Sequence, residues 1–324
     1  MSGVKGLTPE AQYTFLDDLR GVADASANLL SQPSSSTSRM IRKGLVVASF
    51  NSFEGFVKSR FKELSNSVED YKQGRLLFGS MPEDVQKPIL KHVANVTSSY
   101  LGRVNKDTDL NLILPQLNDL GDFLSHASSK RMFSESIGWW AGSNISKEGI
   151  RDLLRMLRVK TPWDVMSSIE FHFGKVNPDM CKLAESRISL RHNAAHDPKF
   201  DCGNLELEEH VRELRSLAFG IDVLSSTAAS LLACGDEVFF KKDTHITGDH
   251  FNSFWEVVPR AKDYAAYRKS GVNRSVGGNR AFRKHSDLFA LISIVKQYWN
   301  KGEYIVVKDE YGQVDWWLPW SYWP

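Results

Sequence analysis

The segment SLRHNAAHDP, residues 189–198, brings one arginine and two histidines together within six positions at the end of an expected helix. Pro198 disfavours α-helical backbone at the residue before it, so we expect the helix to stop there. His192 and His196 are four residues apart and share one helical face. Arg191 and His196 are separated by about 140° around an ideal helix and about 7.5 Å along it. The long arginine could still reach the histidine, either within one chain or across a dimer axis.

This combination of side chains suits the cleavage of RNA without a metal ion. A histidine titrates near neutral pH and can move protons. An arginine grips a phosphate in a bidentate manner and stabilises negative charge that grows on it. The two together fit attack of a ribose 2′-hydroxyl on the adjacent phosphate.

Three other interpretations of the segment stay open. His192 and His196 have the spacing of zinc ligands, but Asn193 stands where an HExxH motif has its glutamate, and the sequence has no other evident His/Cys cluster. The histidines could instead stabilise the C-terminal end of their helix through its dipole. The segment could also be a plain binding site for a phosphate group.

Periodic apolar residues predict helices throughout the chain before residue 235. The expected helices cover residues 8–30, 39–64, 82–99, 108–128, 146–158, 162–173, 178–196 and 204–234. Glu54 lies within an aromatic run of the second helix, as either a solvated flank or a buried polar partner. We therefore predict an all-α bundle as a first domain, residues 1–234.

The composition changes after residue 235, where short apolar runs predict strands. The expected strands are residues 238–240, 304–307 and 314–318, with a hairpin turn at 309–312 and one helix at about 285–300. These elements predict a smaller, aromatic-rich α+β accessory domain over residues 235–324. We expect its C-terminal aromatic run, 316–324, to pack on its own sheet.

The motif RHNAAH, residues 191–196, resembles the Rx4–6H motif of the HEPN superfamily, in the form with a polar residue directly after the arginine. In that family the motif typically ends one helix of an all-α bundle, and a turn leads into a closing helix. In this chain the turn would be residues 197–204, and the closing helix would be residues 205–234. Residues 49–64 look like the family's early helix with its Glu-x-Phe signature. The layout is most similar to the RiboL-PSP type and related HEPN groups of prokaryotic defence systems, over roughly residues 10–234.

The resemblance implies an HEPN-type endoribonuclease that needs no metal or other cofactor and acts as a toxin or an anti-phage defence effector. His196 would be the general acid or base at the 2′-oxygen, Arg191 would stabilise the transition state, and His192 would support the site. Family active sites form where two motif helices meet, which implies a homodimer. An antitoxin or a phage-derived trigger would be a further partner. The alternative is a non-catalytic nucleic-acid-binding or scaffold protein with an HEPN-like bundle for dimerisation.

Positive charge is concentrated in residues 260–284, which hold eight basic residues and one acidic residue, whereas the whole chain has a net charge of +2. The candidate nucleic-acid-binding residues are Arg268, Lys269, Arg274, Arg280, Arg283 and Lys284. Aromatic residues lie among them and could stack on bases. Residues 270–280 are rich in Gly and Ser and predict a loop. A solvated charged loop with no ligand is the other interpretation.

The overall composition is that of a globular protein, with 42% hydrophobic and 25% charged residues. It excludes a disordered chain and a histone-like coat of positive charge. The sequence has neither an apolar stretch of membrane-spanning length nor a secretory apolar segment, so we expect a cytoplasmic protein without membrane contact. Three cysteines, Cys181, Cys202 and Cys234, lack CxxC spacing, which argues against a disulfide framework and a zinc–cysteine site.

Overall fold

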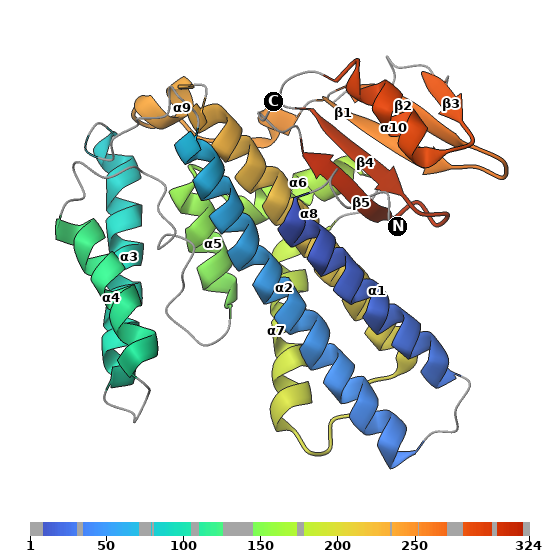
Figure 1. Cartoon of the computed structure of the whole chain (residues 1–324), viewed down its shortest axis with the longest axis horizontal. Helices are drawn as coiled ribbons and strands as arrows, with labels where there is room; N and C mark the ends of the chain where they lie inside the picture. The colour runs from blue at the N-terminus through green and yellow to red at the C-terminus, as the bar shows by residue number, and fades with distance from the viewer. Residues whose placement is uncertain are drawn as a thin grey trace. The chain divides into compact units, whose positions relative to one another are not determined.

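The structure is a computed structural model of the chain. It describes residues 9–30, 35–70, 79, 81–104, 110–125, 145–173, 178–233, 235–251, 253–270, 281–299 and 303–319. Within these residues, long helices occupy the chain up to residue 233, and a five-stranded sheet with a short helix follows (Figure 1). The prediction of a helical region followed by a smaller α+β region is therefore confirmed.

Every helix expected before residue 235 is present. They are α1 (Glu10–Leu30), α2 (Ser36–Asp70), α3 (Glu83–Val104), α4 (Leu110–Ser125), α5 (Lys147–Met156), α6 (Pro162–His172), α7 (Met180–His196) and α8 (Asn204–Ala233). Local capping explains several of their ends. The side chain of Ser146 accepts a hydrogen bond from the N–H of Gly149 at the start of α5, and that of Asp179 accepts one from Lys182 at the start of α7.

The sheet has the strand order β3-β2-β1-β4-β5. Its strands are β1 (Ser253–Pro259), β2 (Tyr264–Ser270), β3 (Arg283–His285), β4 (Tyr304–Lys308) and β5 (Val314–Pro319). Neighbouring strands are antiparallel except for β1 and β4, which are parallel. The strands expected at 304–307 and 314–318 and the turn between them are confirmed, and helix α10 (Leu288–Lys296) lies within the expected range 285–300.

Two expectations after residue 235 are wrong. Residues Glu237–Phe240 form the one-turn helix α9 and not a strand, because the side chain of Asp236 caps the N–H of Val238 and starts a helical turn. Strands β1, β2 and β3 were not expected, and the last two lie in the basic segment. The predicted loop at 270–280 lies outside the described residues except for Ser270, which ends β2.

The chain forms two compact units, and they do not coincide with the predicted domains 1–234 and 235–324. One unit comprises Met1–Val57, Trp163–Ser226 and Gly248–Pro324, and the other comprises Lys58–Pro162 and Thr227–Thr247. The first unit joins the sheet to helices of the predicted all-α region. The amide of Gln12 in α1 donates to the carbonyl of Trp317 in β5, and Trp317 Nε1 donates to the buried Asp222 carboxylate of α8 at 2.6 Å.

The core of this unit is aromatic. Rings from α1, α2, α8 and β5 pack against one another, with centroid distances of 4.9 Å for Phe15–Phe56 and 5.3 Å for Phe219–Trp317. Trp317 is fully buried, so the C-terminal aromatic run packs inward as expected where the structure describes it. Glu54 is also buried, which confirms the second of its two predicted roles. Cys181 and Cys202 are free thiols, and Cys234 lies outside the described residues.

Candidate active site at the end of helix α7

Helix α7 ends at His196, immediately before the residue that Pro198 restricts. Asp197 has extended backbone, and its N–H donates to the carbonyl of Asn193 at 2.9 Å. Its side-chain Oδ1 accepts the N–H of Lys199 at 2.8 Å. These bonds close the helix and turn the chain toward the start of α8. The motif therefore lies where the sequence predicts it, on the last turns of one helix and before a closing helix.

Two side chains from the beginning of α2 hold this turn. Lys43 Nζ donates to the carbonyl of Asp197 at 2.6 Å, and Arg42 Nη2 forms an ion pair with Asp201 Oδ1 at 2.9 Å. The Arg42 side chain is almost completely buried, so this pair is shielded on one side from solvent. A cation beside the last carbonyl of a helix also opposes the negative end of its dipole. The start of α2, the end of α7 and the start of α8 thus meet at the motif.

The two motif histidines contact each other. The ring centroids of His192 and His196 are 4.7 Å apart with an interplanar angle of 48°. Both side chains are exposed on the last two turns of α7. Each imidazole is therefore accessible to a ligand that approaches from solvent.

Arg191 lies on the same two turns but is only partly exposed. Five residues separate it from His196, which corresponds to about 140° around an ideal helix. A site in which both side chains reach one phosphate can therefore draw on a second copy of the chain.

A buried polar layer lies one turn before Arg191, and sequence reasoning missed it. Arg187, on α7, is 9% exposed, and its Nε is 2.9 Å from Glu213 Oε2 on α8. His210, also on α8, is fully buried, and neither of its ring nitrogens makes a hydrogen bond of normal geometry. Burial and the nearby charge of Arg187 lower the pKa of His210 to about 3, although the carbonyl of Val46 opposes this shift slightly. His210 is therefore neutral at neutral pH.

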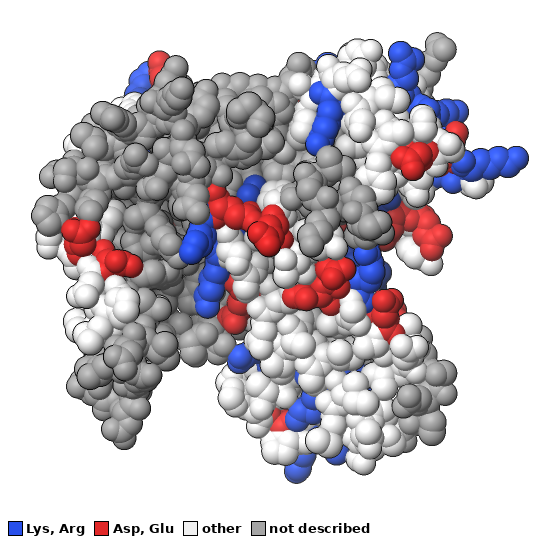
Figure 2. Space-filling view, viewed as in Figure 1, with Lys and Arg blue, Asp and Glu red and all other residues white. Residues whose placement is uncertain are grey.

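The predicted nucleic-acid-binding residues divide between two strands and a segment outside the described residues. Arg268 and Lys269 lie on β2, Arg283 and Lys284 lie on β3, and all four are exposed. Arg274 and Arg280 lie outside the described residues. Figure 2 shows blue side chains gathered at the upper right, over the part of the sheet with β2 and β3. Two of these cations have internal partners: Arg268 pairs with Glu303 at 2.6 Å, and Lys269 pairs with Glu256 at 3.4 Å.

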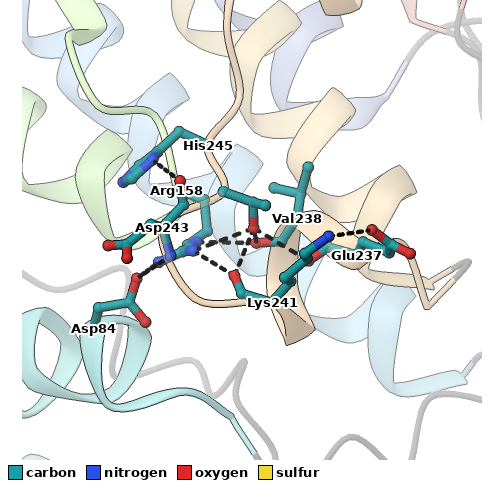
Figure 3. Close-up of polar contacts among 8 residues, drawn as sticks. Asp84, Arg158, Glu237, Val238, Lys241, Asp243 and His245 are labelled. Atoms are coloured by element: carbon teal, nitrogen blue, oxygen red, sulfur yellow. Dashed lines mark hydrogen bonds and ion pairs between the residues drawn. The ribbon is translucent and has the colours of Figure 1, made fainter.

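The second compact unit contains a polar cluster that no motif predicted (Figure 3). Arg158 has a backbone φ of 67° and is 3% exposed. Its guanidinium donates to the Asp84 carboxylate at 2.6 Å and to the carbonyls of Val238 and Lys241 at 3.0 and 3.1 Å. Burial alone would raise the pKa of Asp84, but the hydrogen bonds that it accepts from Arg158 and from the N–H of Asp243, together with the charge of Arg158, outweigh burial and lower that pKa. These contacts hold residues 238–244 in place, so the cluster has a structural role.

Neither a metal-ligand cluster nor a membrane-spanning helix is found among the residues that the structure describes. No group of three or more His, Cys, Asp and Glu side chains there is arranged to hold a metal ion, so His192 and His196 have no third ligand in this set. No described helix is both long and apolar enough to cross a membrane.

Comparison with known proteins yields no relative. The chain matches no protein-family model, no curated protein and no solved structure. The functional interpretation therefore depends on the residues of the site itself.

Proposed function

We propose that this chain is a metal-independent endoribonuclease of the HEPN type, which cleaves RNA by attack of a ribose 2′-hydroxyl on the neighbouring phosphate. The observation that carries the proposal is the exposed pair His192 and His196 on the last two turns of a capped helix, with Arg191 beside it. Proton transfer at the 2′-oxygen needs an accessible imidazole, and the phosphorane-like transition state needs a fixed positive charge.

Each motif residue has a separate role in this reaction. His196 takes the proton of the 2′-hydroxyl or returns one to the leaving 5′-oxygen. Arg191 holds the non-bridging oxygens of the phosphate while negative charge grows on them. His192 supports His196 through the ring contact, which limits the orientations that the His196 imidazole can adopt.

The complete site is proposed to form in a homodimer. Met40 and Ile41 on α2 and Leu205 on α8 are 70%, 40% and 79% exposed. They lie at the helix ends that Lys43 and Arg42 tie to the turn after the motif. Exposed apolar side chains at these helix ends are typical of an interaction surface. A second copy bound there would bring its own Arg191 toward His196, as the resemblance to the HEPN motif implies for a site shared by two motif helices.

The proposed biological role is that of a toxin or an anti-phage defence effector in the cytoplasm, with RNA as substrate. It rests on the similarity of RHNAAH and its helical placement to the HEPN motif. An antitoxin or a phage-derived trigger would then control the exposed site. The basic residues of β2 and β3 are proposed to retain the RNA while the motif cuts it.

A second candidate function is a non-catalytic nucleic-acid-binding or scaffold protein in which the bundle serves dimerisation. The observation in its favour is that the ring of His196 packs against that of His192, an arrangement that a purely structural helix end would also show. Both candidates predict a dimer and binding to nucleic acid. They differ in whether RNA is cut.

The test is cleavage of total cellular RNA, together with growth inhibition, by the wild-type chain and matched variants. His196→Ala should lower cleavage by roughly 10²–10⁴-fold and relieve growth inhibition. Arg191→Lys should also lose most activity, because an ammonium cannot hold two phosphate oxygens as a guanidinium does. His245→Ala, a histidine of the other compact unit, is the matched control and should cleave normally. Cleavage at the wild-type rate by both motif variants would reject the assignment and favour the scaffold.

A further inference from the structure

Two exposed aromatic side chains lie together on one face of the C-terminal sheet. Phe282, just before β3, is 37% exposed, and Tyr298, just after α10, is 47% exposed. Their ring centroids are 4.9 Å apart, and Phe282 also meets the ring of Trp255 in β1 at 4.9 Å. Trp255 is buried, so the three rings lead from the core of the sheet to solvent.

The buried end of this row is held rigidly. The Glu303 carboxylate, 3% exposed, accepts hydrogen bonds from Trp255 Nε1 at 2.9 Å and from the Ser253 hydroxyl at 2.7 Å. It also accepts bonds from Nε and Nη2 of Arg268, at 3.0 and 2.6 Å. A carboxylate with four donors fixes the orientation of the indole on which Phe282 rests. A fixed aromatic surface loses little side-chain entropy when a ligand stacks on it.

Positive charge lies beside the exposed rings. The guanidinium carbon of Arg283 is 5.4 Å from the ring centroid of Phe282, and Lys284 follows on the exposed strand β3. Neither Arg283 nor Lys284 forms an ion pair with any residue that the structure describes. Their charges therefore remain available for an anion, and a polyanion complements this edge of the sheet.

The opposite face of the sheet is already occupied. Phe254 of β1 packs there against Phe173, with ring centroids 4.3 Å apart. Lys269 on that face pairs with Glu256, and Lys308 pairs with the same carboxylate at 2.6 Å. Lys269 and Lys308 thus serve internal contacts on that face, whereas Arg283 and Lys284 beside Phe282 remain available for a ligand.

We propose that Phe282 and Tyr298 form a stacking site for unpaired bases of single-stranded RNA, with Arg283 and Lys284 holding the adjacent phosphates. Bases in a duplex have both faces covered and cannot reach the rings, whereas bases of a single strand can stack on them. Single-stranded DNA offers the same bases and phosphates and is the other source of this chemistry. The choice of RNA rests on the proposed ribonuclease function, for which this surface holds the strand that the motif cuts.

The experiment measures fluorescence anisotropy at low salt with the full-length His196→Ala chain, so that cleavage does not consume the probe. The probes are a fluorescein-labelled oligoadenylate RNA of about eight nucleotides, the DNA strand of the same sequence, and the RNA annealed to oligouridylate. We expect the single strands to bind more tightly than the duplex. The double change Phe282→Ala and Tyr298→Ala should weaken single-strand binding by roughly 5–150-fold for each base that stacks. The slope of affinity against salt should stay the same, because no phosphate contact is removed.

Two further variants guard against misfolding and general surface effects. Phe282→Leu with Tyr298→Leu keeps apolar packing on Trp255 but removes the flat rings, and it should weaken binding like the alanine pair. Tyr311→Ala removes another exposed tyrosine, in the β4–β5 turn beside Asp309 and Glu310, and should change nothing. Unchanged RNA affinity in the leucine pair would overturn the proposal. A chain that binds neither single strand would also overturn the proposal and would leave the surface to a protein partner. Binding to the DNA strand alone would overturn it as well.

The outcomes separate this inference from the ribonuclease proposal. A chain that binds through Phe282 and Tyr298 but whose wild type cuts no RNA contradicts the ribonuclease alone. A chain that cuts RNA but binds it equally well without the two rings contradicts the stacking site alone.

Discussion

The imidazole rings of His192 and His196 contact each other at a centroid distance of 4.7 Å on the last two turns of α7, where both side chains are exposed. The contact follows from their four-residue spacing, which places both side chains on one face of the helix. In the proposed reaction it makes His192 a support for His196 and leaves proton transfer to His196. That division of roles can be tested by changing the ring of residue 192.

His192→Ala should lower the rate of RNA cleavage by up to about 100-fold, because the imidazole of His196 loses the ring that orients it. His192→Phe keeps a ring at that position and should restore most of the rate. The measurement is the rate of RNA cleavage by each of the two variants as a function of pH. Equal loss in both variants, with one limb missing from the pH profile, would instead assign proton transfer to His192.

The proposed composite site predicts that two inactive variants restore each other. After mixing and subunit exchange, His196→Ala and Arg191→Ala should together cleave RNA at about a quarter of the wild-type rate, because half of the dimers are mixed and each has one complete site. A mixture with no more activity than its components would contradict the composite site.

The same surface predicts the oligomeric state. Met40→Glu combined with Leu205→Glu should convert the dimer to a monomer in sedimentation at micromolar concentration and abolish cleavage. Leu101→Glu changes an exposed leucine of α3, in the other compact unit, and is the matched control. A wild-type chain that sediments as a fully active monomer would rule out the dimer.

The burial of His210 predicts that the folded chain loses stability in acid. Its pKa is about 3 in the folded chain and about 6.5 when the chain unfolds. Between these values only the unfolded chain takes up the proton, so the free energy of unfolding falls as the pH drops through this window, by up to about 1.4 kcal/mol per pH unit. His210→Leu cannot titrate and should lose less stability over the same range. Urea unfolding followed by tryptophan fluorescence measures the difference, and parallel pH curves for the two chains would contradict it.

Periodic apolar residues in the sequence were sufficient to predict the helices. The end of α7 follows from Pro198, and in the structure polar caps at Ser146 and Asp179 fix the starts of α5 and α7. Strands β1, β2 and β3 were missed because strand formation depends on pairing with other strands, such as β4, that are distant in the sequence. The turn at Glu237–Phe240 was misjudged because a three-residue apolar run fits either period.

The site was only partly predictable for the same reason. The spacing of His192 and His196 placed both rings on one face. The ion pair of Arg187 with Glu213 and the buried His210 depend on how α7 packs against α8 and on no motif. Phe282 could be noticed in the basic segment, but its neighbour Tyr298 could not, since only the folded sheet brings them together.

The end groups of the RNA fragments test the central claim most directly. The wild-type chain is incubated with RNA in EDTA, and the termini of the products are determined alongside those from His196→Ala. Attack by the 2′-hydroxyl predicts fragments with 2′,3′-cyclic phosphate and 5′-hydroxyl ends, formed in EDTA and absent with His196→Ala. Loss of all cleavage in EDTA with recovery in magnesium, or fragments with 3′-hydroxyl and 5′-phosphate ends, would contradict a reaction carried by Arg191 and His196.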